Sequence, residues 1–132
     1  MAELNNILAA NEEYSKSFKY GDLRGPPSRK LAVLACMDAR LSIKDLLGLS
    51  TGDAHIIRNA GRIATDDAIR SLIISHELLG TQEFMVINHT GCGMLTFKDE
   101  DLRDKLKEST KPMQMDSIFI HSQTLSRMSG IK

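Results

Sequence analysis

Two cysteines and one histidine stand where they could share a metal ion. Cys36 ends one apolar run, and His89 and Cys92 follow another in a His-x-x-Cys spacing. Thiolates and imidazoles are zinc ligands, and three protein ligands leave the fourth tetrahedral position open, as in catalytic rather than structural zinc sites. The count of two cysteines alone favours buried thiols, with reactive thiols and metal ligands as the alternatives. The surrounding residues must decide between these interpretations.

A carboxylate and a guanidinium follow the first cysteine. In the segment 36–40, Asp38 and Arg40 occupy alternate positions after Cys36. Alternate residues of an extended segment face the same side, so all three could address one site. An Asp and an Arg two positions apart are, taken alone, more typical of a local ion pair. The combination with the His-x-x-Cys pair is far more specific than either part.

The apolar pattern alternates short strands with helices. Residues 31–36 are apolar throughout, which is typical of a strand buried on both faces of a parallel sheet. The other predicted strands are 54–58 and 84–87, and the predicted helices are 3–19, 42–47, 66–79 and 99–108. This alternation predicts an α/β domain with a mostly parallel central sheet flanked by helices. Ligands of such sheets bind beyond the carboxyl ends of the strands, where the cysteines and His89 lie.

Helix ends are marked by capping residues. Thr65 is a candidate N-cap for the helix at 66–79, and Gly48 and Gly80 are candidate C-terminal glycines. The charged stretch 98–108 is typical of a solvated helix face.

Composition excludes several classes of protein. The chain has 132 residues with 17 Lys+Arg and 17 Asp+Glu, so the formal net charge is zero, which argues against a nucleic-acid or anionic-membrane binder. The longest apolar run, 31–37, is far shorter than the ~18 residues of a membrane span. No basic-then-apolar signal segment begins the chain. We expect a soluble, cytoplasmic protein forming one domain over 1–132.

Three segments resemble the signature segments of β-class carbonic anhydrases, in the order and spacing of that family. They are Cys-Met-Asp-Ala-Arg-Leu at 36–41, Arg-Asn-Ala-Gly at 58–61 and His-Thr-Gly-Cys-Gly-Met at 89–94. The resemblance is closest to the compact prokaryotic branch and covers residues from about 1 to 108. It implies a β-carbonic anhydrase-like fold.

The resemblance also implies a site and a reaction. The implied zinc ligands are Cys36, His89 and Cys92, with Asp38 able to occupy the fourth position in a closed, inactive state. Asp38 and Arg40 are the implied catalytic dyad, in which the arginine draws the aspartate off the metal. Gly61 is expected to offer backbone donors near the substrate. The implied reaction is the reversible hydration of CO2 to bicarbonate with zinc-bound hydroxide as nucleophile.

Two further readings stay open. The same zinc site could hydrolyse a CO2 analogue such as carbon disulfide or carbonyl sulfide, or the chain could bind zinc with little or no activity. Family members are dimers or higher oligomers, so we expect a homodimer formed through the helix at 3–19. Residues from about 112 to 132 depart from the family pattern, and we interpret them as either a frameshifted or a short natural C-terminus.

The remaining histidines and two methionines have simpler interpretations. His55 and His76 are expected to be packing or surface residues, and His121 even more so. Met37 and Met94 flank the motifs and are candidate pocket residues.

Overall fold

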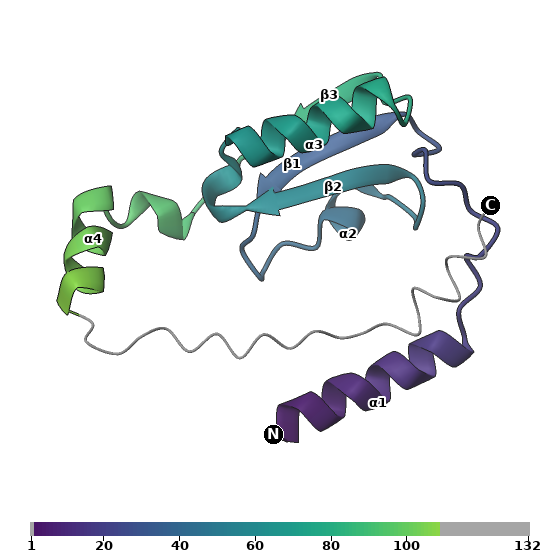
Figure 1. Ribbon diagram of the computed structural model, residues 1–132, viewed down its shortest axis with the longest axis horizontal. Coiled ribbons are helices and arrows are strands. Elements are labelled where there is room, and N and C mark those ends of the chain that lie inside the picture. The colour runs from purple at the N-terminus through teal and green to yellow at the C-terminus, as the bar shows by residue number, and fades with distance from the viewer. Residues whose placement is uncertain (1, 109–132) are drawn as a thin grey trace. The chain divides into compact units, whose positions relative to one another are not determined.

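A computed structural model describes residues 2–108 of the chain (Figure 1). Among them, the residues up to Arg24 and those from Gly25 onward form separate compact units. The first unit carries the helix α1 (Ala2–Lys16). The predicted helix at 3–19 is therefore present but ends earlier. The Ser17 hydroxyl donates to the carbonyl oxygens of Glu13 and Tyr14 at 3.0 and 3.3 Å, which satisfies acceptors of the last turn.

The second unit is built on a parallel sheet. Its described strands are β1 (Leu31–Cys36), β2 (Ala54–Asn59) and β3 (Glu83–Val86), in the order β2-β1-β3. Both neighbours run parallel to β1, and Leu31 pairs with Ala54 of β2 on one side and with Glu83 of β3 on the other. The predicted α/β architecture with a parallel sheet is confirmed, with strand boundaries within one residue of those expected.

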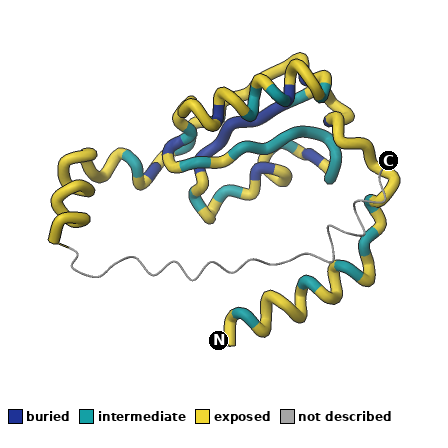
Figure 2. Tube along the Cα trace, in the orientation of Figure 1, coloured by how far each residue is buried: buried dark blue, intermediate teal, exposed yellow. Residues whose placement is uncertain are grey.

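The central strand forms the core. All of β1 after its first residue is buried, and it is the longest dark-blue stretch in Figure 2. Val33 and Ala35 pack with Ile43, the first residue of the short helix α2 (Ile43–Leu47). Burial on both faces is what the uninterrupted apolar run predicted.

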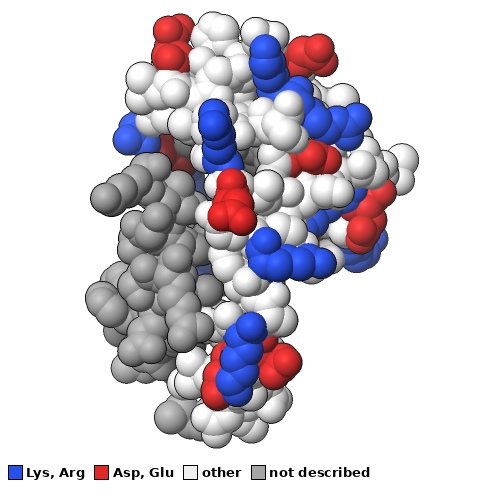
Figure 3. Space-filling model, turned by 90° about the vertical axis from the view of Figure 1, so that its right-hand side faces the viewer, with Lys and Arg blue, Asp and Glu red and all other residues white. Residues whose placement is uncertain are grey.

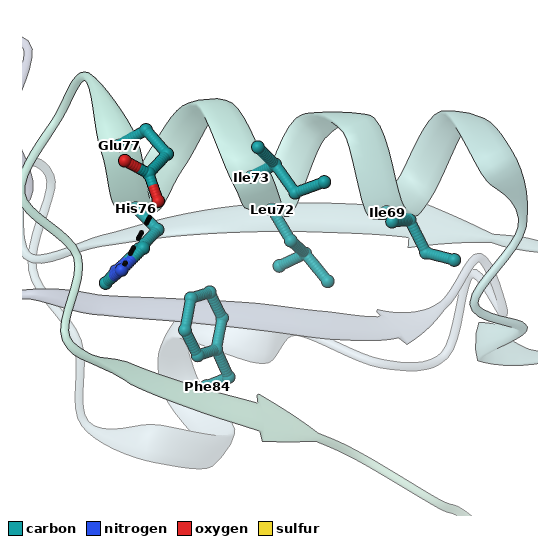
Figure 4. Close-up of a pocket in the computed structure, with 6 residues that line it drawn as sticks. All are labelled: Ile69, Leu72, Ile73, His76, Glu77 and Phe84. Carbon is teal, nitrogen blue, oxygen red and sulfur yellow. Dashed lines mark ion pairs between the residues drawn. The ribbon is translucent and has the colours of Figure 1, made fainter.

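Helices cover both faces of the sheet. Phe84 of β3 lines a hollow against the helix α3 (Asp66–Glu77), whereas its neighbour Met85 lines one that includes Leu47 of α2. Successive residues of a strand point to opposite faces, so α3 and α2 lie on opposite sides (Figure 1). Figure 4 shows the α3 hollow, which is lined by Ile69, Leu72, Ile73, His76, Glu77 and Phe84.

Thr65 and Gly48 cap helices as the sequence predicted. The Thr65 hydroxyl oxygen accepts a hydrogen bond from the Ala68 amide at 3.3 Å, and so begins α3 as predicted. Gly48 closes α2 in the left-handed conformation at φ 60°. Gly80 also has a positive φ, 74°, but α3 ends at Glu77, earlier than the predicted 79.

The remaining described elements are two short 3-10 turns and one helix. The turns are η1 (Ala60–Arg62) and η2 (Gly93–Leu95), and the helix is α4 (Asp99–Glu108). None of the α4 residues is buried, as expected for a solvated helix. The atypical segment at 112–132, with His121, lies outside the described residues.

Surface charge and hydropathy agree with the composition. On the face seen in Figure 3, basic and acidic side chains of the described residues are intermingled. None of the helices within residues 2–108 is long and apolar enough to cross a membrane.

Candidate metal centre

The three predicted ligands converge at one edge of the sheet. Cys36 is the last residue of β1, and His89 and Cys92 lie in the loop that follows the neighbouring strand β3. Because the two strands are parallel, their carboxyl ends meet at the same edge. The three ligand atoms lie within 4.8 Å of one another, and this is the one Cys/His/Asp/Glu group of metal-binding geometry found among residues 2–108.

The separation of the two sulfurs suits a shared metal ion. The Sγ atoms of Cys36 and Cys92 are 3.9 Å apart, and both residues are 4% exposed. Two Zn–S bonds of about 2.3 Å at a tetrahedral angle span about 3.8 Å. A disulfide would require about 2.05 Å, and both cysteines are free thiols. The donor set therefore fits zinc without rearrangement of the sulfurs.

His89 presents one ring nitrogen to the same point. Its Nδ1 lies 3.1 Å from the Thr90 carbonyl oxygen, to which it can only donate. That bond selects the tautomer in which Nε2 keeps its lone pair. Nε2 is buried and is the one side-chain nitrogen or oxygen in the described part of the chain that is buried without a hydrogen-bond partner. Such orphaned atoms are rare, and a metal ion would satisfy this one.

Backbone amides prepare Cys36 to act as a thiolate. Hydrogen bonds to the sulfur, chiefly from the Asp38 amide and also from the Gly61 amide, lower the Cys36 pKa to about 7. Metal ligation requires the deprotonated thiol. Gly61 reaches this position at φ 79°, where a Cβ would lie 3.0 Å from the Met94 Cγ. Its predicted role in substrate binding stays a prediction.

Asp38 and Arg40 form a bidentate pair beside the cysteines. Arg40 Nε donates to Asp38 Oδ1 at 2.9 Å, and Nη2 donates to Oδ2 at 2.6 Å. These bonds hold the pKa of the Asp38 carboxyl well below its usual range. Arg40 Nη2 also donates to the Gly91 carbonyl at 3.0 Å, which joins the segment at 36–40 to the loop carrying His89 and Cys92.

The 58–61 motif has contacts that sequence reasoning did not foresee. The Arg58 guanidinium donates to the carbonyl oxygens of Cys36 and Asp38. The Asn59 side chain brackets the η1 turn, since its Oδ1 accepts from the Ile63 amide and its Nδ2 donates to the Ile63 carbonyl. The motif was identified only through its resemblance to a family, because its residue types do not predict hydrogen bonds to main-chain groups.

Two histidines take packing roles away from the cluster, as expected. His55 Nδ1 lies 2.7 Å from the buried Ser75 hydroxyl, and His76 Nδ1 lies 2.7 Å from the Thr81 carbonyl oxygen. His76 also pairs with Glu77 at 3.7 Å, the dashed contact in Figure 4.

Comparison with known proteins places the chain in a family. A model of the family described as carbonic anhydrase matches residues 31–127. The chain is 50% identical over 110 residues to beta-carbonic anhydrase 1 of Mycobacterium tuberculosis, covering 83% of this chain and 67% of that protein. The chain belongs to the β-class carbonic anhydrases. This is a family of metalloenzymes, and the family match extends to residue 127, into the segment at 112–132 that was expected to depart from the family pattern.

Two further proteins that the chain resembles broaden the comparison. A carbon disulfide hydrolase of an Acidianus strain is 52% identical over 97 residues, 71% of this chain and 48% of that protein. The crystal structure of the Streptococcus mutans carbonic anhydrase superposes with a TM-score of 0.77 at 41% identity, covering 90% of this chain and 72% of that one. The chain thus spans about two thirds of the mycobacterial protein and about half of the Acidianus protein.

Replacing Cys92 by serine tests the predicted ligand set. A neutral hydroxyl is a poor zinc ligand beside a thiolate and an imidazole, so C92S is expected to lose bound zinc during gel filtration. Metal analysis after purification without chelators should give one zinc per wild-type chain and almost none for C92S, with the thermal melt checking that the variant is folded. Stoichiometric zinc in folded C92S would contradict the assignment.

Proposed function

We propose that this chain catalyses the reversible hydration of CO2 to bicarbonate, with Zn²⁺ held by Cys36, His89 and Cys92. The observation that carries the proposal is the meeting of two buried sulfurs with an unpartnered imidazole nitrogen. When bound by three protein ligands, zinc lowers the pKa of water at its open position toward ~7. The 50% identity to a mycobacterial beta-carbonic anhydrase supports this choice of reaction.

Asp38 orients the attacking water in this mechanism. Its low pKa keeps the carboxylate ionised and therefore a hydrogen-bond acceptor only. Oδ1 accepts from both the backbone amide and Nε of Arg40, whereas Oδ2 accepts only from Nη2 and retains a second lone pair for the water. With its proton given up to solvent, the resulting hydroxide would be oriented by Asp38 so that its oxygen forms the new C–O bond while one C–O π pair of CO2 moves to the CO2 oxygen, which gives bicarbonate.

Arg40 keeps Asp38 available for that role. A carboxylate is itself a zinc ligand, and an aspartate bound to the metal would close the site. The bidentate bonds from Arg40 engage both carboxylate oxygens and favour the open state. This arrangement supports an active enzyme over the alternative of a zinc protein whose site is closed by Asp38.

Hydrolysis of carbon disulfide is the second candidate activity. The observation that favours it is the 52% identity to an Acidianus carbon disulfide hydrolase. Both substrates are linear, uncharged molecules with an electrophilic central carbon, so the same nucleophile serves both. Parallel assays with the two substrates distinguish the activities.

We also propose a homo-oligomer in a reducing, cytoplasmic compartment. The described helix α1 has no buried residue, and Ile7, Leu8 and Tyr14 are exposed on it by 42 to 49%. Such apolar side chains support packing of this helix on a second copy. A reducing compartment would keep Cys36 and Cys92 as the thiols that zinc requires.

The proposed reaction is tested by stopped-flow CO2 hydration between pH 6 and 9. The zinc-loaded wild type should hydrate CO2 with a rate that rises with pH, because the deprotonated water is the nucleophile. D38A should keep its zinc and lose about 10²–10⁴-fold in kcat. D22A, which removes an exposed carboxylate from the other unit, is the matched control and should behave as wild type.

Three results would contradict the proposal. They are a wild type that binds one zinc and is inactive at every pH, a D38A variant with undiminished turnover, and turnover of carbon disulfide but not of CO2. The first would favour the zinc-binding protein without activity, and the third the hydrolase.

The oligomer is tested by light scattering coupled to gel filtration. The wild type should elute with at least twice the mass of one chain, and an I7E/L8E double variant should shift toward the monomer because two charges cannot be buried in an apolar contact. A wild type that is monomeric at micromolar concentration would refute this part of the proposal.

A further inference from the structure

We propose that Arg58 is a positioning residue of the metal centre. It fixes the backbone of residues 36–38, and through that backbone it sets the places of the Cys36 sulfur and the Asp38 carboxylate. The proposal rests on the metal site of the proposed function and assigns a role to a motif that the mechanism above leaves unused.

The contacts of Arg58 are directed at one short segment. Its Nε donates to the Cys36 carbonyl oxygen at 2.9 Å, and its Nη2 donates to the Asp38 carbonyl oxygen at 2.7 Å. The described ion pairs do not include Arg58, so these donors are engaged by backbone rather than by a carboxylate. The planar guanidinium presents its N–H groups in a fixed fork, so the two carbonyls are held at a set separation.

Arg58 makes these two hydrogen bonds at the point where strand β1 ends. β1 ends at Cys36, and one further backbone bond, from the Met37 amide to the Asn59 carbonyl at 2.8 Å, continues toward β2. Arg58 adds a hydrogen bond to the carbonyl of the residue before Met37 and another to the carbonyl of the residue after it. The carbonyls of residues 36 and 38 and the amide of residue 37 are therefore all fixed from the end of β2.

Arg58 holds the peptide units 36–37 and 38–39, which flank the unit that carries the Asp38 amide. The carbonyls of Cys36 and Asp38 are turned toward Arg58, whereas the Asp38 amide is turned to the Cys36 sulfur. The Asp38 side chain leaves the same segment to meet Arg40 at 2.6 and 2.9 Å. One guanidinium thus holds the backbone from which both a ligand and the water-orienting carboxylate project.

Lysine cannot reproduce this arrangement. A single ammonium at the end of a flexible chain can reach either carbonyl but has no rigid fork to hold both. R58K should therefore restore part of the function lost in R58M, which has no donor. Arg70, an exposed arginine of α3, offers R70K as the control for an arginine-to-lysine change elsewhere.

The test measures zinc release to a chelator, well below the melting temperature, together with kcat and KM. R58M should release zinc about 10–100-fold faster than wild type, the range seen when groups supporting metal ligands are removed. R58K should fall between the two, and R70K should match wild type. For R58M, kcat should fall while KM stays unchanged, because the variant displaces Asp38 but leaves the binding of CO2 unaltered.

A metal-free measurement keeps this inference separate from the proposed function. In the zinc-free protein, hydrogen exchange of the Met37 amide should be faster in R58M than in wild type or R70K. Wild-type exchange of that amide in R58M would overturn the positioning role, as would a lowered melting temperature with unchanged zinc release and kcat. A wild type that takes up no zinc would instead refute the proposed function, and the exchange experiment would still decide the role of Arg58.

Discussion

The parallel pairing of β1 with both of its neighbours is the constraint on which the site depends. It places the ends of three strands at one edge, so Cys36 from β1, the loop with His89 and Cys92 after β3, and Arg58 at the end of β2 meet. Were β3 antiparallel, its following loop would begin at the opposite edge, about 13 Å away for four residues at ~3.3 Å each. The ligands are far apart in sequence and are joined only by this topology.

The side chains at this edge of the sheet are suited to a cation. Two buried sulfurs and an unpartnered imidazole nitrogen are costly together in a protein interior unless a metal ion or protons satisfy them. The neighbouring carboxylate of Asp38 is a potential competitor for that ion, and Arg40 neutralises it with two hydrogen bonds. The three unsatisfied donor atoms and the Arg40–Asp38 pair both favour three protein ligands and an open fourth position. This is the arrangement that catalysis by zinc needs.

Much of this could be predicted from the sequence because the relevant signals are local. The apolar run at 31–36 predicted a strand buried on both faces, Thr65 predicted a helix start, and the positions of Cys36, His89 and Cys92 after strands predicted that they would meet. The early end of α1 was not predicted, because the apolar spacing does not reveal that the Ser17 hydroxyl bonds the carbonyls of Glu13 and Tyr14 in the last turn. The contacts of Arg58 could not be predicted either, because their acceptors are main-chain carbonyls, which every residue possesses.

The central claim is that zinc is held by two sulfurs and one imidazole with Asp38 off the metal. Zinc K-edge absorption spectroscopy of the loaded wild type and of D38A tests it directly. Both proteins should show two sulfurs at about 2.3 Å and two lighter atoms at about 2.0–2.1 Å from the zinc, with superimposable spectra. A spectrum with fewer than two sulfurs, or one that changes when Asp38 is removed, would contradict it.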